Sequence, residues 1–405
     1  MKILYLSNHR YDFSLKSTYN NGGWIESLTE SISKIKDFDV NIAYFAKRNS
    51  PAMKIDGIKF YPVDFNNKLF IDRVKRYFEL DKPLRKKQTL ALIDKIKPDI
   101  IHIFGMECFA CDFIEEIKSK SDVILHIQGF LMPIYNSFFP PYSLYSFKNF
   151  FRAYKKLKSR AFNSLKTIKN IKYYSGRTEW DRNLIDFYSK NYAYFNINEI
   201  LRSEFYESDK WTIKDNNIII ITSTISDVIY KGLDIIFKTS KLLIKKKINF
   251  RWNIIGLNYN SFTIKFYEKN FRTKCNDLNI YPLGICNTKE IINNLLKSNL
   301  YVHPSYIENS CNSLCEALML GLPTISNNVG GISSFINNME NGELIPSNDP
   351  SLLAARIITI CNDKKIQQTY SRNARKSSLN RHNKKSIILS TVKMYNEINS
   401  KKYEK

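Results

Sequence analysis

The stretch from residue 299 to residue 326 constrains the fold of this chain more than any other part of the sequence. An apolar run over 299–303 is typical of a buried strand, and a polar loop with Glu308 follows it. A helical pattern comes next, carries Glu316 near its start and ends at a Gly-Leu-Pro turn. A second apolar run follows over 324–326. A strand, a helix and a strand in this order predict a doubly wound α/β domain, in which ligands bind where strands end and helices begin.

The same alternation of strands and helices runs through both halves of the chain. Its 405 residues exceed what one compact core holds, so we expect two Rossmann-like domains with parallel sheets. The expected domains are 1–205 and 206–383, followed by a helix over 384–405 that packs back toward the first domain. The stretch 198–214 lacks a clear period and is the expected linker. Candidate functional residues occur in both halves, so we expect the chemistry in a cleft between the domains.

The predicted strands are short apolar runs between turn residues, and the predicted helices have an apolar face of helical period. The strands are expected at 2–7, 40–45, 99–104, 123–127, 171–174, 193–197, 218–222, 251–255, 279–282, 299–303 and 324–326. The helices are expected at 23–36, 231–246, 262–275, 288–297, 350–361, 364–379 and 384–399, with a helix-rich stretch before residue 169.

Charge and cysteine content limit the partners and the compartment. The chain has 62 Lys and Arg against 38 Asp and Glu, a formal charge of +24, which indicates an anionic partner: nucleic acid, anionic lipid or a phosphorylated small molecule. Seven cysteines without a regular framework indicate reduced thiols in a cytosol. Cys108 and Cys111 have zinc-like spacing but no second pair, so core packing is the favoured interpretation, as it is for Cys311 and Cys315.

No stretch approaches the roughly 18 apolar residues that span a bilayer, and the first residues read as a strand rather than a signal peptide. Any membrane association is therefore expected to be peripheral.

Two glycine-containing turns precede predicted helices and are candidate phosphate sites. Gly22 and Gly23 would let the backbone approach a ligand closely, although the spaced glycines of a dinucleotide fingerprint are missing and an ordinary turn is the alternative. Lys231 precedes Gly232 at the start of another helix, where a lysine can neutralise a diphosphate leaving group. The alternative for Lys231 is a solvated surface lysine.

The two glutamates of the opening stretch occupy different settings. Glu316 lies within a helix that begins at Asn312 or Ser313, where its carboxylate can accept hydrogen bonds from the vicinal hydroxyls of a sugar. Glu308 precedes that helix, and the loop between them offers backbone N–H groups to an anion. The Asp-x-Asp motif at Asp37 and Asp39 precedes a strand, at the end of the sheet away from ligands, so we interpret it as a solvated loop and expect no metal site.

This chain resembles the family 4 glycosyltransferases of the two-domain GT-B fold. The family pattern E-x7-E followed by A-x-x-x-G-x-P is matched by Glu308, Glu316, Ala317, Gly321 and Pro323. The resemblance extends to Val329, Gly330 and Gly331, to Gly342 and Asp349-Pro350, and to the turns at Gly22-Gly23 and Lys231-Gly232. It covers nearly the whole chain and is strongest over 299–350.

The resemblance implies a role for each matching residue. Glu316 would hold the nucleotide ribose, Glu308 would lie beside the transferred sugar, and Lys231 would stabilise the departing diphosphate. Gly22 and Gly23 would border the acceptor and the phosphates. The other implied donor contacts are loop and glycine positions: Asn309, Ser310, Cys311, Asn312, Gly330 and Gly331. The implied reaction retains the anomeric configuration by front-face attack and needs neither metal nor cofactor, because Lys231 and helix amino ends supply positive charge.

Three positions depart from the family pattern. Ser226 stands where many members have an arginine five residues before the lysine, and Arg177 or Arg202 is the hypothetical replacement for that phosphate arginine. Gln128 stands where many members have histidine; it can hydrogen-bond a hydroxyl but cannot act as a base. His126 lies on the same strand face and is either a catalytic or a core residue. The segments around Arg177 and Arg202 resemble those of bacterial surface-polysaccharide enzymes.

A basic and aromatic stretch over 135–172 indicates a membrane surface as partner. Between Val123 and Thr178 the sequence has no Asp or Glu but interleaves lysines and arginines with Phe and Tyr. A helix with this composition suits an anionic membrane, and ordinary packing with a solvated face is the alternative. Nucleic-acid binding fits less well because no nucleic-acid motif is present, and we expect none.

Together these features predict a retaining glycosyltransferase that uses a nucleotide-sugar donor and a lipid-linked glycan acceptor in bacterial surface polysaccharide synthesis. It is expected in the cytoplasm, peripherally on the inner face of the cytoplasmic membrane. The alternatives are a catalytically silent nucleotide-sugar-binding or membrane-scaffold protein and another GT-B enzyme such as a nucleotide-sugar epimerase. The sequence does not identify the base, the sugar, the acceptor or the linkage.

Overall fold

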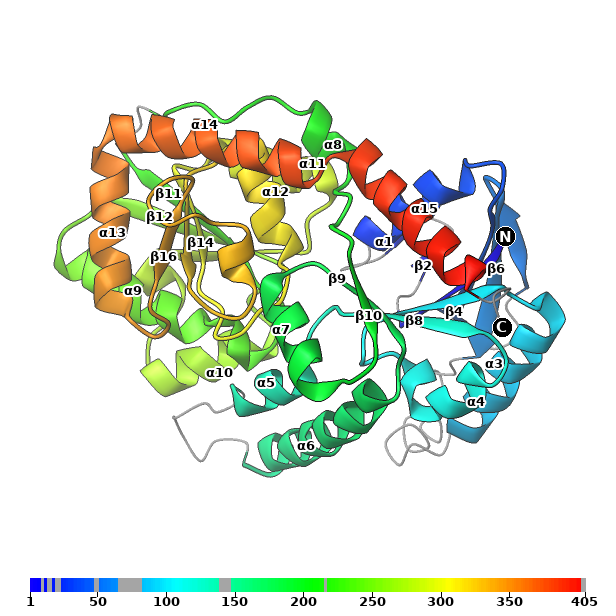
Figure 1. Cartoon of the computed structure of the whole chain (residues 1–405). Coiled ribbons are helices and arrows are strands. Elements are labelled where there is room, and N and C mark those ends of the chain that lie inside the picture. The colour runs from blue at the N-terminus through cyan, green and yellow to red at the C-terminus, as the bar shows by residue number, and fades with distance from the viewer. Residues whose placement is uncertain are drawn as a thin grey trace. The chain divides into compact units, whose positions relative to one another are not determined.

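The chain forms two compact α/β units in a computed structural model (Figure 1). Unit 1 comprises Met1–Leu131, Lys158–Ile200 and Asn383–Lys405, and unit 2 comprises Met132–Leu157 and Leu201–His382. The structure describes residues 1–8, 11–12, 17–18, 23–46, 51–64, 82–137, 147–214 and 217–401. Gly22 lies outside these residues.

Unit 1 is built on an eight-stranded sheet in the order β10-β9-β8-β7-β1-β4-β6-β5. Every neighbouring pair is parallel except β5 and β6. The strands are β1 (Lys2–Ser7), β4 (Asp39–Ala46), β5 (Met53–Ile55), β6 (Ile58–Asp64), β7 (Ile100–Phe104), β8 (Asp122–His126), β9 (Tyr173–Gly176) and β10 (Ala193–Asn196), and β2 (Tyr11–Asp12) pairs with β3 (Ser17–Thr18) separately. Because the strands after β1 extend to one side before β7 pairs on its other side, the strand order reverses between β1 and β7.

Two apolar clusters cover the two faces of this sheet. One contains Trp24 and Leu28 of α1 together with Met394 and Tyr395 of α15, so the last long helix is part of unit 1. The helices along this part of the chain are α1 (Gly23–Ser33), α3 (Lys82–Ile96), η1 (Phe109–Phe113), α4 (Ile114–Lys118), α5 (Leu131–Asn136), α6 (Phe147–Lys169), α7 (Glu179–Tyr188) and α15 (Lys384–Ser400).

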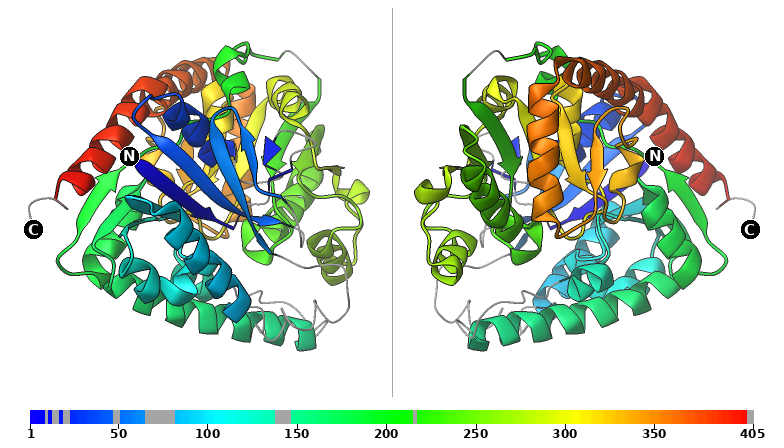
Figure 2. Two further views of the ribbon diagram at one scale, coloured as in Figure 1. Left: turned by 90° about the vertical axis from the view of Figure 1, so that its right-hand side faces the viewer. Right: turned by 90° about the vertical axis from the view of Figure 1, so that its left-hand side faces the viewer.

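Unit 2 contains a six-stranded, fully parallel sheet in the order β13-β12-β11-β14-β15-β16 (Figure 2). The strands are β11 (Ile219–Thr224), β12 (Phe250–Ile255), β13 (Ile280–Gly284), β14 (Leu300–His303), β15 (Thr324–Asn327) and β16 (Glu343–Ile345). The strand order reverses between β11 and β14, and this switch point is where open α/β sheets bind ligands.

Helices cover both faces of the second sheet, again over two apolar clusters. They are α8 (Ser203–Glu207), η2 (Ile229–Lys231), α9 (Leu233–Lys245), α10 (Phe262–Phe271), η3 (Asn276–Leu278), α11 (Thr288–Lys297), α12 (Asn312–Leu320), η4 (Ile332–Ser334), α13 (Pro350–Asn362) and α14 (Lys364–Arg381). No helix among the described residues is long and apolar enough to cross a membrane.

The predicted strands and helices are present, most within a few residues of their expected ends, but the chain divides differently from the expectation. The units separate after Ile200 rather than after residue 205, and 132–157 belongs to unit 2. The expected linker contains α8, because Leu201 and Phe205 bury their apolar side chains in the cluster around α12. Strand β6 was not predicted from the sequence, because Pro62 interrupts its apolar pattern. In the structure Pro62 pairs with Tyr44 of β4, near the sheet edge.

Candidate functional site

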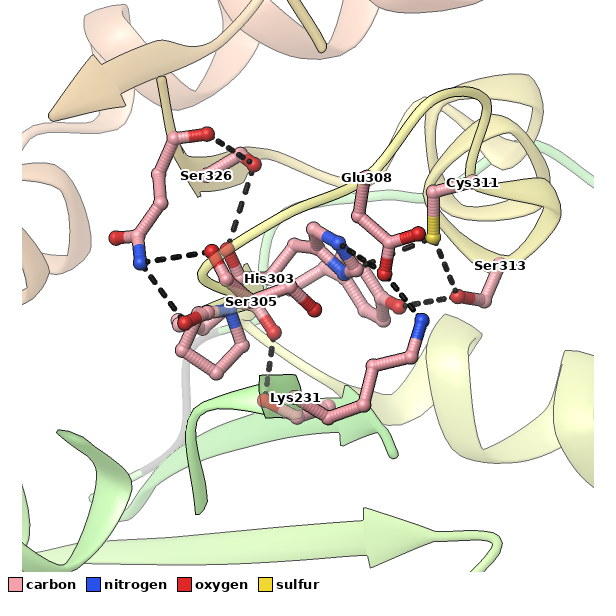
Figure 3. A network of polar contacts seen from close by, with 12 residues as sticks. Lys231, His303, Ser305, Glu308, Cys311, Ser313 and Ser326 are labelled. Carbon is pink, nitrogen blue, oxygen red and sulfur yellow. Dashed lines mark hydrogen bonds and ion pairs between the residues drawn. The ribbon is translucent and has the colours of Figure 1, made fainter. Parts of the chain in front are cut away.

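Lys231 and Glu308 form an ion pair at the switch point of unit 2. Lys231 follows β11 and Glu308 follows β14, the two strands between which the strand order reverses. Both side chains are largely buried, with 19% and 11% of their surface exposed. The two residues are 77 positions apart in the sequence, so only the sheet topology brings them together (Figure 3).

Two glycines with positive φ let the loops around this pair approach each other. Gly232 has φ +76°, and a Cβ there would lie 2.0 Å from the carbonyl oxygen of Pro304. Gly330 has φ +53°, and a Cβ there would lie 1.8 Å from the carbonyl oxygen of Glu308, which also accepts a hydrogen bond from Gly331 N–H at 3.0 Å. Any larger residue would push these backbones apart, so the glycines set the position of the Lys231–Glu308 pair.

His303, the last residue of β14, is a second cationic neighbour of Glu308. Its Nε2 lies 3.4 Å from Glu308 Oε1. Burial alone would lower the pKa of His303, but Cys311 and Glu308 outweigh burial and raise it to about 9. Burial would raise the pKa of Glu308, but Lys231 and His303 outweigh it and lower the pKa to about 2. Glu308 is therefore ionised near neutral pH and is not a proton donor there.

Cys311 lies on the other side of His303. Its Sγ is 3.7 Å from His303 Nδ1 and 3.1 Å from Ser313 Oγ. Burial opposes the thiolate, but His303 more than compensates, so the pKa of this thiol is lowered. From the sequence, Cys311 was predicted to pack in the core, with its loop position implying a contact to the donor, and His303 was not among the predicted site residues.

The amino ends of α9 and α12 differ from those of the other long helices of unit 2. Helices α11, α13 and α14 each receive a hydrogen bond from their N-cap side chain, and Asp227 accepts from the first N–H groups of α10. The N-cap residues of α9 and α12, Gly232 and Cys311, provide no such bond. These two helix ends adjoin the Lys231–Glu308 pair, and their backbone N–H groups suit an anion.

Glu316 is held by Arg202 rather than by a lysine or a backbone group. Arg202 Nε and Nη2 donate to Glu316 Oε1 at 3.0 and 2.7 Å, and Arg202 Nη1 donates to Thr288 Oγ1 at 2.9 Å. Burial raises the pKa of Glu316, and Arg202 opposes this shift. Arg202 is one of the two predicted phosphate arginines, and in this structure its guanidinium binds the carboxylate of Glu316.

The remaining donor residues of the prediction lie around these groups. Asn309 is buried and Ser310 half-buried in the loop before α12, and Asn312 is the first residue of that helix. Gly330 and Gly331 follow β15 and pack on the Glu308 backbone. Unit 2 therefore assembles the predicted donor residues, from Lys231 to Gly331, around one switch point.

Among the residues of unit 1 that the structure describes, the predicted candidates do not form a comparable charged cluster. His126 is completely buried, its Nδ1 lies 2.8 Å from Ser175 Oγ, and the Trp24 ring lies against it with centroids 4.8 Å apart. Burial lowers the pKa of His126 well below its usual value, which favours the core interpretation of this residue. The Arg177 guanidinium is also buried, and its Cζ lies 4.7 Å from the centroid of the Trp24 ring. Gln128 is half-buried just after β8, and Gly23 begins α1.

Glu107 is a residue of unit 1 that the sequence analysis did not single out. It follows β7, and Asn8, which follows β1, donates a hydrogen bond from Nδ2 to its carbonyl oxygen at 2.6 Å. Burial raises the pKa of the Glu107 carboxyl, while Arg160 and Arg177 oppose this shift. A carboxyl group thus lies at the switch point of unit 1 as well.

Comparison with known proteins finds a family match within unit 2. Residues 205–377 match the family model described as "Glycosyl transferases group 1". This range lies within unit 2 and contains Lys231, His303, Glu308, Cys311 and Glu316, whereas Arg202 precedes it. Residues 205–377 of unit 2 are therefore similar to a group 1 glycosyl transferase domain.

A curated relative is similar over part of its length. The chain is 26% identical over 166 residues to the capsular polysaccharide biosynthesis glycosyltransferase CapM of Staphylococcus aureus. The match covers 41% of this chain and 43% of CapM, so it spans less than half of that relative.

Solved structures are similar over nearly the whole chain. Sucrose-phosphate synthase from Thermosynechococcus elongatus superposes with a TM-score of 0.76 at 14% identity, covering 99% of both chains. Anabaena Alr3699/HepE in complex with UDP has a TM-score of 0.68 at 15% identity, covering 98% of this chain and 100% of that chain. At these identities the similarity concerns the fold, and the predicted GT-B fold with two Rossmann-like units is confirmed.

Proposed function

We propose that this chain, whose second unit is similar to a group 1 glycosyl transferase domain, transfers a sugar from a nucleotide-sugar donor to a glycan acceptor in bacterial surface polysaccharide synthesis. The anomeric configuration is retained, and the reaction needs no metal. The observation that carries this proposal is the buried Lys231–Glu308 pair between two uncapped helix ends in unit 2.

The cluster suits the departure of a nucleoside diphosphate. Lys231 offers an ammonium group, and the amino ends of α9 and α12 offer backbone N–H groups from two further directions. Such preorganised donors stabilise charge that develops on a leaving group, and here they replace the metal ion that other transferases use. Glu316 is placed within α12, where it would accept hydrogen bonds from the ribose hydroxyls while Arg202 holds its carboxylate.

Glu308 would act as an ionised group beside the transferred sugar. Its low pKa leaves it without a proton to donate near neutral pH and, with Lys231 and His303 in contact with it, makes it a weak base. A fixed negative charge stabilises the oxocarbenium-like character of a sugar in a transition state. In a front-face reaction, the departing diphosphate oxygen takes the acceptor proton, so the mechanism does not require a base from unit 1.

The test is a screen of UDP-, GDP-, ADP- and dTDP-sugars by thermal shift, followed by product analysis with the donor that binds. Transfer or donor hydrolysis should disappear in Glu308→Gln and Lys231→Ala and persist in Lys245→Met, an exposed lysine of α9. A stabilising donor that the wild-type chain neither transfers nor hydrolyses would support the binding or scaffold alternative. Conversion of the donor to an epimer would support the epimerase alternative.

The acceptor is proposed to be lipid-linked, at the inner face of the cytoplasmic membrane. Along α6 the side chains of Lys155, Lys156, Lys158, Lys166 and Lys169 are exposed, and Phe162 is 50% exposed among them. An exposed basic face with an aromatic side chain is typical of helices that bind anionic lipid surfaces.

Vesicle co-sedimentation tests this part of the proposal. The chain should bind anionic vesicles and not zwitterionic ones, and replacing Lys155, Lys158 and Lys166 by Gln should weaken binding. Replacing three exposed lysines of unit 2, Lys245, Lys246 and Lys247, is the matched control. Equal binding of both triple variants would show that only net charge matters and would remove the role of α6.

A further inference from the structure

We propose that His303, Glu308 and Cys311 form a binding site for one zinc ion. A neutral imidazole, a carboxylate and a thiolate are each ordinary zinc ligands, so zinc would displace the protons of His303 and Cys311, and three protein ligands leave a fourth position for water or a phosphate oxygen. One potential ligand atom from each residue lies within 4.8 Å of the other two. The cluster belongs to one short segment, the end of β14 and the loop before α12, so no distant parts of the chain have to move together.

The three side chains lie close together, with the thiol and the carboxylate next to different nitrogens of the His303 ring. Cys311 Sγ lies 3.7 Å from His303 Nδ1, and His303 Nε2 lies 3.4 Å from Glu308 Oε1. Two ligand atoms on one tetrahedral zinc ion stand about 3.3–3.7 Å apart, given metal–ligand bonds of roughly 2.0–2.3 Å. His303 and Cys311 are buried, with 1% and 7% of their surface exposed, and both lie beside Glu308 (Figure 3). Because one zinc ion binds only one of the two ring nitrogens, the imidazole must turn, or the Cys311 side chain must change its rotamer, to bring three ligand atoms onto one ion.

The donor set favours zinc over the hard cations of many transferases. Magnesium and calcium prefer sites built from oxygen atoms, and this cluster offers one carboxylate beside a sulfur and a nitrogen. Thiol and imidazole ligands favour zinc, and cobalt can replace zinc at such a site. Bound Co²⁺ gives a charge-transfer band in the absorption spectrum when a thiolate is one of its ligands.

Lys231 makes this site inhibitory rather than catalytic. Its ammonium group contacts Glu308, the carboxylate that the metal needs, so zinc and the ammonium compete for one charge partner. When zinc binds, Lys231 must leave Glu308, and its flexible side chain can turn away. This consequence rests on the proposed function: with Lys231 displaced, the departing diphosphate would lose a cation and transfer would slow.

The first experiment titrates the metal-free, reduced chain with Zn²⁺ and, in parallel, with Co²⁺. We expect one metal ion per chain and a thiolate-to-cobalt charge-transfer band. Cys311→Ser should remove that band and weaken zinc binding by at least about tenfold, and His303→Asn should weaken it similarly. Cys361→Ser, which removes another free thiol of unit 2, should change neither. Absence of stoichiometric binding, or a band that persists in Cys311→Ser, would overturn the proposal.

A second variant has the opposite expected effect. Lys231→Met removes the competing ammonium group and should tighten zinc binding, by about tenfold for the loss of one like charge near the site. Weaker or unchanged binding in Lys231→Met would show that the metal does not bind Glu308. A protein that merely unfolds on substitution would lose metal affinity in every variant, so a gain distinguishes a real site from damage.

The metal measurements do not depend on sugar transfer, so the two proposals can fail separately. Zinc binding without transferase activity would support the zinc site and contradict the proposed function. Sugar transfer by a chain that binds no zinc would support the proposed function and contradict the zinc site. If both hold, zinc should inhibit transfer by the wild-type chain, and a chelator should restore the rate. Inhibition of the same extent in Cys311→Ser, measured relative to that variant's own rate, would contradict the site.

Discussion

His126 and His303 are both buried and both end a parallel strand, yet their environments drive their charges in opposite directions. His126 in unit 1 lies against Trp24 and Ser175, and burial lowers its pKa well below its usual value. His303 in unit 2 lies between Glu308 and Cys311, which outweigh burial and raise its pKa to about 9. Burial acts alike on both rings, so the neighbouring carboxylate and thiol decide the difference. Unit 1 thus holds His126 as a neutral core residue, whereas unit 2 holds His303 as a buried cation.

The strongest test of this contrast removes the central cation of unit 2. Lys231→Met should lower kcat for sugar transfer by about 10²–10³-fold, because the leaving diphosphate loses a preorganised positive charge. Steady-state kinetics with the donor found in the screen measures this, and Lys245→Met on the same helix is the control. A change of less than about threefold would mean that the buried charge of unit 2 is structural, as in unit 1.

The second test asks whether the backbone geometry around Glu308 is required. Gly330→Ala should cost about 3 kcal/mol of stability, since its Cβ would lie 1.8 Å from the Glu308 carbonyl oxygen. Gly284→Ala is the matched control: its φ is also positive, +77°, but nothing lies within 4 Å of its Cβ, so it should cost about 1 kcal/mol. Chemical denaturation measures both. Equal losses would show that φ alone matters and that the close approach to Glu308 does not.

The third test concerns the pairing of Glu316. Arg202→Met leaves a buried carboxylate without its cation, so Glu316 should take up a proton and bind ribose poorly. We expect KM for the donor to rise about 10–100-fold with a smaller change in kcat, because ribose binding is lost in ground and transition state alike. Arg251→Met, another arginine of unit 2 outside the cluster, serves as control. A fall in kcat at constant KM would instead assign Arg202 to the diphosphate.

The smallest effect is expected from the neutral histidines of unit 1. Burial lowers the pKa of His102 to about 3, so its neutral form stabilises the fold above pH 6.5, and this contribution is lost as the pH falls toward 3. At pH 5 the loss amounts to about 2 kcal/mol at most. The difference in unfolding free energy between pH 7 and pH 5 should therefore shrink in His102→Asn. An unchanged difference would mean that His102 is solvated, and the contrast between the units would weaken.

Much of the fold could be predicted from hydrophobic periodicity alone. Buried parallel strands such as 299–303 read as continuous apolar runs, and α11 was predicted with its ends correct, because Asn287 and Glu290 form a capping box and Lys297 lies in the last turn. The strands β5 and β6 were missed because lysines and Pro62 interrupt their apolar pattern. Short elements near a sheet edge depend on neighbouring strands for their stability, which local sequence does not express.

The candidate site was predictable where chemistry resides in a local motif. Glu308, Glu316 and Lys231 stood out because each lies at a helix start within a motif that matches the family pattern. The partners of these residues were not predictable. Arg202 is 114 positions from Glu316, and His303 looked like an ordinary strand residue.

The sequence by itself determined the two α/β units, the switch-point loops and the residue types that line them, because periodicity, turn residues and helix starts are local properties. Only the tertiary structure decided which charges meet. It placed Lys231 and His303 on Glu308, Arg202 on Glu316, and Trp24 over His126. The reason is electrostatic: the state of a buried ionisable group depends on partners within a few ångströms, and partners such as Lys231 and Arg202 come from parts of the chain far from Glu308 and Glu316.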